Sequence, residues 1–276
     1  MIYLSILIIY LLLLSFIFVY SLAQLNLLYN YLKWEKTEKD SVTELDLSNQ
    51  ENIPFVTIQL PIYNEKQVAE RLIRQICQLK YVPNKLEIQV LDDSTDASAK
   101  TNQTLVEAFQ KEGINITYLH RKNRIGFKAG ALKEGLKVAS GEFIAIFDAD
   151  FLPKKDWLLK TIHHFENDKI GVVQTRWGHL NKNYSLITKI QAFALDFHFV
   201  LEQVGRNVGN HFINFNGTAG VWRKSCIYDA GNWQGDTLTE DLDLSYRAQL
   251  KSWKFKYLID VVTPAELPIV ISAARS

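Results

Sequence analysis

Short apolar runs alternate with stretches of helical periodicity between residues 55 and 147, and this alternation constrains the fold more than any other feature. Apolar runs of four to eight residues next to turn-forming residues are typical of buried strands. Strands that alternate with helices at this spacing predict an α/β fold with a doubly wound, Rossmann-like, mostly parallel sheet flanked by helices. The expected strands are Phe55–Leu60, Leu86–Leu91, Ile114–Leu119 and Glu142–Phe147, and the expected helices are Glu65–Leu79 and Gly126–Val138.

Polar residues follow three of these strands at the point where each strand ends. The segments are Tyr63-Asn64-Glu65, Asp92-Asp93-Ser94 and Asp148-Ala149-Asp150. In a doubly wound sheet, ligands bind beyond the carboxyl ends of the strands. We therefore expect these side chains to converge on one site.

The pattern is looser in the C-terminal part of the chain. An amphipathic helix over Tyr184–Val204 is expected either to lie at a membrane interface or to pack on the core. A loop of small residues, Asn216-Gly217-Thr218, separates two apolar segments, and a last helix is expected over Leu238–Leu250. The apolar segments are Phe212–Phe215 and Ala219–Arg223.

No charged side chain occurs in residues 1–32, which are mostly Leu, Ile, Val, Phe and Tyr. At ~1.5 Å per residue, a helix of this length spans the ~30 Å hydrocarbon core of a bilayer. A signal peptide is the alternative, but no basic segment precedes the run and its length exceeds the usual apolar region. The sequence thus predicts a transmembrane anchor at 1–32, a juxtamembrane linker at 33–53 and a folded domain at 54–276. Three basic residues follow the anchor, so the positive-inside rule predicts a single-pass membrane protein with its domain in the cytosol; they are Lys33, Lys36 and Lys39.

Composition excludes several classes of protein. The net charge of +1 leaves no basic excess to neutralise phosphates, so we expect no nucleic-acid partner. Cys77 and Cys226 lie far apart and are expected to be reduced thiols, not part of a disulfide or zinc framework. The six histidines form no His-Glu-x-x-His pattern, which argues against a zinc enzyme.

Asp148 and Asp150 stand two residues apart after a buried-looking strand. A buried strand that ends in two acids needs a compensating charge. Mg²⁺ and Mn²⁺ prefer such oxygen ligands and share them with substrate phosphates. The pair therefore predicts a divalent metal site.

Three further groups each allow a functional and a structural interpretation. Asp92 and Asp93 suit the base and ribose of a nucleotide, or an Asx-turn and helix cap. Lys128, in the basic segment 120–130 at a helix start, suits a diphosphate, or belongs to a solvated loop. The acids of Thr239-Glu240-Asp241 either cap a helix or include a general base. Neither a P-loop nor a dinucleotide-binding fingerprint occurs in the chain.

Taken in order, four motifs resemble those of family-2 glycosyltransferases with the GT-A fold. Their order and spacing are most similar to the cellulose-synthase-like branch, in particular its glucomannan mannosyltransferase-like members. The resemblance extends from about Pro54 to Pro268. The motifs are Leu60-Pro-Ile-Tyr-Asn-Glu65, Val90-Leu-Asp-Asp-Ser94, Phe147-Asp-Ala-Asp150 and Thr239-Glu-Asp241.

This resemblance implies roles for individual residues. Asp241 would be the catalytic general base, and Asp148 and Asp150 would hold Mg²⁺ or Mn²⁺. The loop Phe215–Ala219 would face the acceptor. Tyr63 would line the base pocket, Asp92 and Asp93 would contact the base and ribose, and Lys128 would approach the diphosphate. The full set of residues expected to bind the nucleotide-sugar donor is Tyr63, Glu65, Asp92, Asp93, Lys128, Asp148 and Glu240.

The implied reaction is the inverting transfer of a hexose from UDP-glucose or GDP-mannose to a glycan or lipid acceptor, in the synthesis of a β-linked polysaccharide. A catalytically inactive nucleotide-sugar-binding or scaffold subunit is the alternative. A nucleotidyltransferase explains neither the Thr-Glu-Asp motif nor the apolar N-terminus. The family's Gln-x-x-Arg-Trp motif and C-terminal transmembrane helices do not occur before Ser276. We therefore expect a chain truncated at its C-terminus, in which donor binding survives better than polymerisation.

Overall fold

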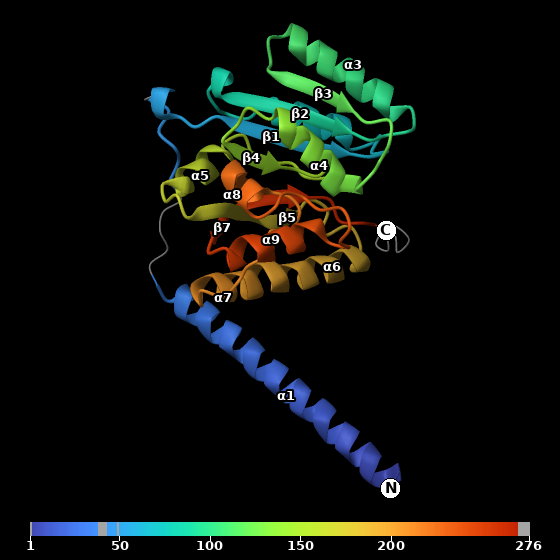
Figure 1. The fold of residues 1–276 in the computed structure, drawn as a ribbon, viewed down its shortest axis with the longest axis vertical. Helices are drawn as coiled ribbons and strands as arrows, with labels where there is room; N and C mark the ends of the chain where they lie inside the picture. The colour runs from blue at the N-terminus through green and yellow to red at the C-terminus, as the bar shows by residue number, and fades with distance from the viewer. Residues whose placement is uncertain (1, 38–42, 49, 270–276) are drawn as a thin grey trace.

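The structure is a computed structural model that describes residues 2–37, 43–48 and 50–269. A long N-terminal helix, α1 (Ile2–Glu35), projects from one end of an α/β domain (Figure 1). Lys39 and the end of the expected domain, residues 270–276, lie outside the described residues. The orientation expected from the basic residues therefore stays a prediction.

A seven-stranded sheet organises the domain, with its strands in the order β3-β2-β1-β4-β6-β5-β7. All neighbouring strands run parallel except β6, which is antiparallel to both β4 and β5. The prediction of a mostly parallel sheet is thus confirmed. The strands are β1 (Val56–Ile62), β2 (Leu86–Asp92), β3 (Ile116–His120), β4 (Phe143–Ile146), β5 (Ile170–His179), β6 (Gly220–Arg223) and β7 (Lys254–Ala265).

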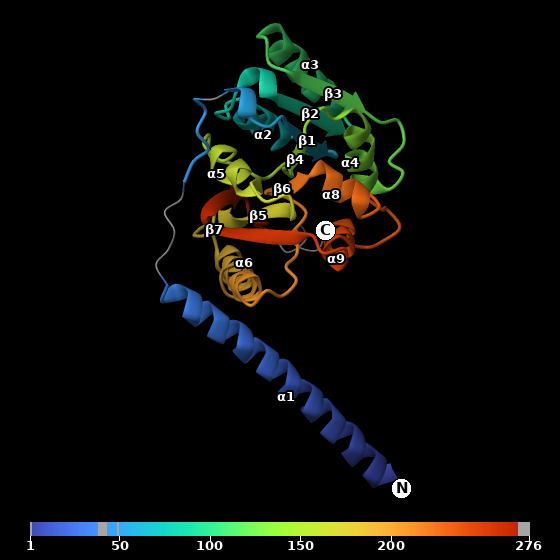
Figure 2. The same ribbon diagram turned by 60° about the vertical axis from the view of Figure 1, so that its left-hand side comes forward.

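Helices cover both faces of the sheet because the buried strands carry apolar side chains on both sides. In β4, Phe143 and Ala145 join the hydrophobic cluster that includes α2 and α3, whereas Ile144 and Ile146 join the cluster that includes α4, α8 and α9. Figure 2 shows α2 and α4 on opposite sides of the sheet. The helices are α2 (Ala69–Ile76), α3 (Ser98–Lys111), α4 (Phe127–Val138), α5 (Leu159–Ile162), α6 (Leu186–Asp196), α7 (Gln203–Val208), α8 (Lys224–Asp229) and α9 (Glu240–Leu250), with short 3₁₀ turns at Gln50–Asn52, Pro83–Lys85 and His163–Phe165.

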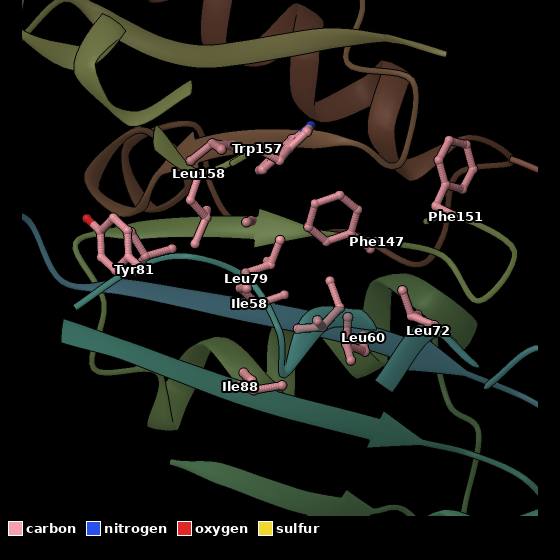
Figure 3. Close-up of a cluster of buried hydrophobic side chains, with 14 of the residues drawn as sticks. Ile58, Leu60, Leu72, Leu79, Tyr81, Ile88, Phe147, Phe151, Trp157 and Leu158 are labelled. Atoms are coloured by element: carbon pink, nitrogen blue, oxygen red, sulfur yellow. The ribbon is translucent and has the colours of Figure 1, made fainter. Parts of the chain in front are cut away.

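Figure 3 shows the core on the α2 side of the sheet, where Ile58 and Leu60 of β1 lie close to Phe147 and Trp157. The rings of Phe147 and Trp157 meet edge to face, with centroids 4.7 Å apart. Trp157 also donates a hydrogen bond of 2.8 Å from Nε1 to Thr263 Oγ1 on β7. This hydrogen bond attaches the segment that follows Asp148 and Asp150 to β7, at one edge of the sheet.

The amphipathic helix expected over Tyr184–Val204 is present, but it is longer and interrupted. It runs through α6, a π-helical segment η4 (Phe197–Glu202) and α7, and ends at Val208. Its first turn is fixed by a capping box between Ser185 and Thr188. Phe199 and Val204 are buried against β7, so core packing, one of the two expectations, is confirmed for that face.

Several expected elements differ from the structure. The helix expected from Glu65 starts at Ala69, because residues 65–68 form a turn in which the Glu65 carbonyl accepts from the Val68 N–H. The helix expected from Leu238 starts at Glu240. Strands β5 and β7 were not predicted, because polar and charged residues interrupt their apolar pattern.

Candidate active site

A cavity of about 790 Å³ lies beyond the carboxyl ends of β1, β2 and β4. This is the sheet edge at which the sequence predicts a site. Six of the predicted residues line the cavity: Tyr63, Glu65, Asp93, Lys128, Asp148 and Asp150. Glu240 and Asp241 do not line it, but their charges act on Lys128.

Lys128 occupies the centre of the charged groups. Its Nζ lies 2.5 Å from Asp148 Oδ1 and donates a 3.0 Å hydrogen bond to the carbonyl of Gly217. Burial lowers the pKa of Lys128, but the surrounding carboxylates, Asp148 first, outweigh burial and raise the pKa above its usual value. The ammonium group is therefore a permanent positive charge between the strand-end acids and α9.

The turn at residues 216–218 connects these groups. Thr218 Oγ1 accepts a 2.8 Å hydrogen bond from the backbone N–H of Asp148. Gly217 has a φ of +77°, and a Cβ placed on it would lie 3.1 Å from Asp241 Oδ2 and 3.3 Å from Lys128 Nζ. A side chain at this position would therefore separate the lysine from the acid that the resemblance makes a general base.

Asp150 and Glu65 are carboxyl groups with raised pKa. Burial, followed by the negative charge of Asp148, raises the pKa of Asp150 to about 6. The same two causes raise the pKa of Glu65. A divalent cation would relieve this repulsion, and the oxygen donors of Asp148 and Asp150 are of the kind that Mg²⁺ and Mn²⁺ accept.

No group of three or more His, Cys, Asp or Glu side chains within the described ranges could hold a metal ion. Mg²⁺ and related ions are commonly held by one or two carboxylates together with substrate phosphates. The pair Asp148 and Asp150 fits such a shared site better than a site built from protein ligands alone.

Asp241 and Glu240 form the first turn of α9. Burial raises the pKa of both carboxyl groups, although the positive charge of Lys128 works against that shift. Asp241 Oδ1 accepts a 2.8 Å hydrogen bond from the Leu242 N–H, whereas Thr239 makes no side-chain capping bond. Two neighbouring acids have other surroundings: Asp243 pairs with Arg247, and Asp236 lines a second cavity.

Two buried side chains attach α9 to the loop that precedes the turn. Ser245 Oγ accepts a 3.0 Å hydrogen bond from the Phe215 N–H. The carboxamide of Gln249 accepts from the Ile213 N–H at 3.0 Å and donates to the Ile213 carbonyl at 2.8 Å. The position of Asp241 relative to Gly217 is thus fixed through backbone groups.

Asp93 and Tyr63 also line the cavity, and each is held by an arginine. Arg121 Nε donates to Asp93 Oδ1 at 2.7 Å, and its Nη2 pairs with Asp93 Oδ2. The guanidinium of Arg124 lies over the Tyr63 ring, 3.4 Å from its centroid. The positive charge of the segment 120–130 is evident from the sequence, but the sequence pattern does not indicate which arginine holds which side chain.

Asp92 lies apart from the cavity. It is fully buried, and its carboxylate accepts hydrogen bonds from the Ser94 N–H at 2.8 Å, Asn102 Nδ2 at 2.9 Å and the Tyr118 hydroxyl at 3.1 Å. Successive side chains of a strand point to opposite sides, which explains why Asp92 and Asp93 have different surroundings. In this geometry Asp92 supports the strand end, while Asp93 faces the cavity.

The rim of the cavity includes residues for which the sequence pattern predicts no role. Glu266 pairs with Arg71 at 2.6 Å, and Asn181 exchanges two 2.8 Å hydrogen bonds with the backbone of Leu267. Thr218 and Gly217 belong to the acceptor-side loop that the resemblance indicated, but their individual contacts needed the structure. These interactions bring the segment after β7 to the cavity.

Comparisons with known proteins agree with this arrangement. The model of glycosyl transferase family 2 matches residues 57–227. The probable glucomannan 4-beta-mannosyltransferase 4 of Oryza sativa subsp. japonica is 47% identical over 227 residues, which cover 80% of this chain and 41% of that protein. Glucomannan 4-beta-mannosyltransferase 7 of Arabidopsis thaliana is 41% identical over 251 residues, which cover 89% of this chain and 44% of that protein. The chain thus spans less than half the length of these relatives.

Among solved structures, the mannosyltransferase PcManGT from Pyrobaculum calidifontis, in complex with GDP-Man and Mn²⁺, superposes with a TM-score of 0.71. The match covers 92% of this chain and 67% of that chain, at 22% sequence identity. It confirms the fold expected from the resemblance, a GT-A-like sheet flanked by helices.

Proposed function

The chain belongs to glycosyltransferase family 2, and on that basis we propose that it transfers a mannosyl group from GDP-mannose, with inversion, to a β-linked glycan. The identity of 41–47% with glucomannan 4-beta-mannosyltransferases supports GDP-mannose over UDP-glucose, the other donor expected from the sequence. The observation that carries the proposal is the convergence of Lys128, Asp148 and Asp150 in one cavity, next to Asp241 across Gly217.

Donor binding is assigned to the cavity. The base and ribose would lie at the end that carries Tyr63 and Asp93, where Arg121 and Arg124 hold those side chains in place. The diphosphate would lie at Lys128, whose positive charge stabilises the nucleotide diphosphate as it leaves. Glu65 and Glu240 would lie near the sugar and the phosphates, and Asp92 would act by supporting the strand end that presents Asp93.

A divalent ion would be held by Asp148 and Asp150 together with the donor phosphates. Mg²⁺ or Mn²⁺ supplies Lewis-acid stabilisation of the leaving group when bound. Thr218 keeps the backbone of Asp148 in place through its hydroxyl. The Mn²⁺ in the complex of PcManGT is consistent with this assignment.

Asp241 would remove the proton from the attacking acceptor hydroxyl. Burial raises the pKa of its carboxyl group, which makes it a stronger base than an exposed aspartate. The acceptor would approach from the side of the 215–219 loop, which borders Asp241. Direct attack by the hydroxyl inverts the anomeric carbon and requires no covalent intermediate on the chain.

Membrane attachment through α1 also belongs to this proposal. The helix is long and apolar enough to cross a bilayer, and most of its side chains before Gln24 are exposed. A cytosolic domain would have direct access to nucleotide sugars, and a glycan or lipid acceptor would be met near the membrane.

Calorimetric titration of the detergent-solubilised chain tests the donor assignment. We expect GDP-mannose to bind in the presence of Mn²⁺ and to bind far more weakly in its absence or to Asp150→Ala. UDP-glucose serves as the matched competitor. Binding of UDP-glucose alone would reassign the donor, and donor binding without any turnover would favour the inactive nucleotide-sugar-binding subunit.

A further inference from the structure

The π-helical segment η4 places an ionisable side chain beside the turn at residues 216–218. π-helical turns are uncommon and are frequently found at functional sites. Here the altered backbone register is held by Tyr257 on β7, whose buried hydroxyl donates a 2.6 Å hydrogen bond to the Phe199 carbonyl. Phe199 itself is buried, and its ring packs on the ring of Trp177, with the two centroids 4.8 Å apart.

The side chain presented by this segment is His198. One ring nitrogen, Nδ1, lies 2.8 Å from Glu202 Oε2, and the other, Nε2, lies 3.2 Å from Asn216 Oδ1. The Phe199 ring meets the imidazole edge to face, with centroids 5.0 Å apart. The ring is therefore held on three sides, while 31% of the side chain stays exposed.

The carboxamide of Asn216 is oriented by these contacts. Its Nδ2 donates to the Asn214 carbonyl at 3.4 Å, which directs Oδ1 towards His198. The backbone N–H of Asn216 is bound separately, by Gln174 Oε1 at 3.0 Å. Only the side chain of Asn216 thus depends on the histidine, and it directly precedes Gly217, which borders Lys128 and Asp241.

Other contacts already join this helix to the loop. Gln203 Nε2 donates to the Asn214 carbonyl at 3.1 Å, and Gln249 and Ser245 hold the loop from α9. The loop therefore does not need the pair of His198 and Asn216 for its backbone position. With Nδ1 at Glu202 and Nε2 at Asn216, the ring connects the two side chains and holds the amide in one orientation.

We propose that His198, held by Glu202, is a positioning residue that orients the Asn216 carboxamide towards the acceptor glycan. The inference rests on the proposed function, because it requires that the acceptor hydroxyl reaches Asp241 along the 215–219 loop. An amide in a fixed orientation can hydrogen-bond a sugar hydroxyl and align the neighbouring hydroxyl for attack. Donor binding is assigned to the cavity, whose lining includes neither His198 nor Asn216, and therefore should not depend on this pair.

Steady-state kinetics of the full chain in detergent with GDP-mannose, Mn²⁺ and β-1,4-linked mannotetraose test this role. Two rates are measured, mannosyl transfer to the tetrasaccharide and release of GDP by hydrolysis without acceptor. We expect His198→Phe to lower transfer, expressed as kcat/KM for the acceptor, by roughly 10- to 100-fold, because the Asn216 amide loses the contact that orients it. The KM for GDP-mannose and the rate of hydrolysis should stay within about twofold of wild type.

The matched variants separate orientation from folding. His198→Gln can still donate to Asn216 and should recover part of the transfer rate, and Asn216→Ala should reproduce the loss without altering η4. Lys189→Ala changes an exposed residue of the same helix and should have no effect. If His198→Phe does not fold, the Asn216→Ala result decides.

Equal kcat/KM for the acceptor in wild type, His198→Phe and Asn216→Ala would overturn the inference and leave the proposed function intact. Hydrolysis without transfer in the wild-type chain would also overturn it, since no acceptor would then use this loop. A wild-type chain that neither binds nor turns over GDP-mannose would contradict the proposed function itself.

Discussion

Gly217 is the residue whose backbone brings the lysine, the strand-end acid and the α9 acid together. Its φ of +77° suits glycine, and any Cβ would contact Asp241 and Lys128. We predict that Gly217→Ala lowers mannosyl transfer by at least about tenfold, because the methyl group pushes the general base away from the acceptor. Gly113→Ala is the matched control, since Gly113 has a φ of +86° and no atom within 4 Å of its Cβ position. Both variants should lose about 1 kcal/mol of stability, and equal activity in the two would contradict the role of Gly217.

Buried carboxyl groups at the cavity predict a pH dependence of stability. The pKa of Asp150 rises from 3.8 to about 6 in the folded chain, so the folded chain binds this proton more readily than the unfolded chain. Folding is therefore favoured at low pH, and that contribution is lost as the pH rises from about 4 to about 6. We predict that, in EDTA, Asp150→Asn raises the Tm at pH 7.5 and that this gain falls to roughly half at pH 5, inside the range between the two pKa values.

His164 contributes the opposite trend, because burial lowers its pKa to about 3 and protonation then opposes folding. That contribution is common to both proteins and cancels when wild type and Asp150→Asn are compared. Thermal unfolding at the two pH values is the measurement. A Tm difference that is equal at both would contradict the raised pKa of Asp150.

At the scale of elements, α9 is placed by its polar side chains as well as by its apolar face. Gln249→Leu would remove the carboxamide that hydrogen-bonds the N–H and carbonyl of Ile213, and would leave these two backbone groups unpaired in the protein interior. We predict a loss of about 2–4 kcal/mol in unfolding free energy, together with a lower kcat, because Asp241 belongs to the same helix. Gln103→Leu, whose side chain donates only to Glu107 on α3, should change stability by less than about 1 kcal/mol. Equal losses in the two variants would contradict a special role for Gln249.

The elements show which parts of the fold the sequence made predictable. Strands β1, β2, β3 and β4 were predicted because each is an apolar run next to a polar end. Strands β5 and β7 were missed because residues such as Arg176 and Lys256 interrupt their pattern, and their pairing is set by tertiary contacts.

The residues of the candidate site also differ in how far the sequence predicts them. Strand-end acids such as Asp148 and Asp150 were predictable from position alone. The contacts of Thr218 and His198 were not, because they depend on a left-handed turn and a π-helical segment that leave no clear sequence signal.

At the scale of the whole molecule, the C-terminal half of α1 lies against α7 and η4 of the domain. Leu27 is the one buried residue among those described for α1, and the backbone there packs closely on Gly205 of α7. We predict that the full chain floats with liposomes, whereas a chain that lacks residues 2–22 stays largely in the soluble fraction and keeps its GDP-mannose affinity. The shorter chain retains Leu27, so its domain should melt within a few degrees of wild type. Equal flotation of both chains would contradict α1 as the membrane anchor.

The central claim is that a metal-dependent donor site and the base Asp241 act together in sugar transfer. The most direct test measures transfer of radiolabelled mannose from GDP-mannose to β-1,4-linked mannotetraose, with Mn²⁺, by wild type and Asp241→Asn. We predict transfer by the wild-type chain and a loss of roughly 10²- to 10⁴-fold in Asp241→Asn, with GDP-mannose affinity within about twofold. Transfer by Asp241→Asn at the wild-type rate would contradict the account.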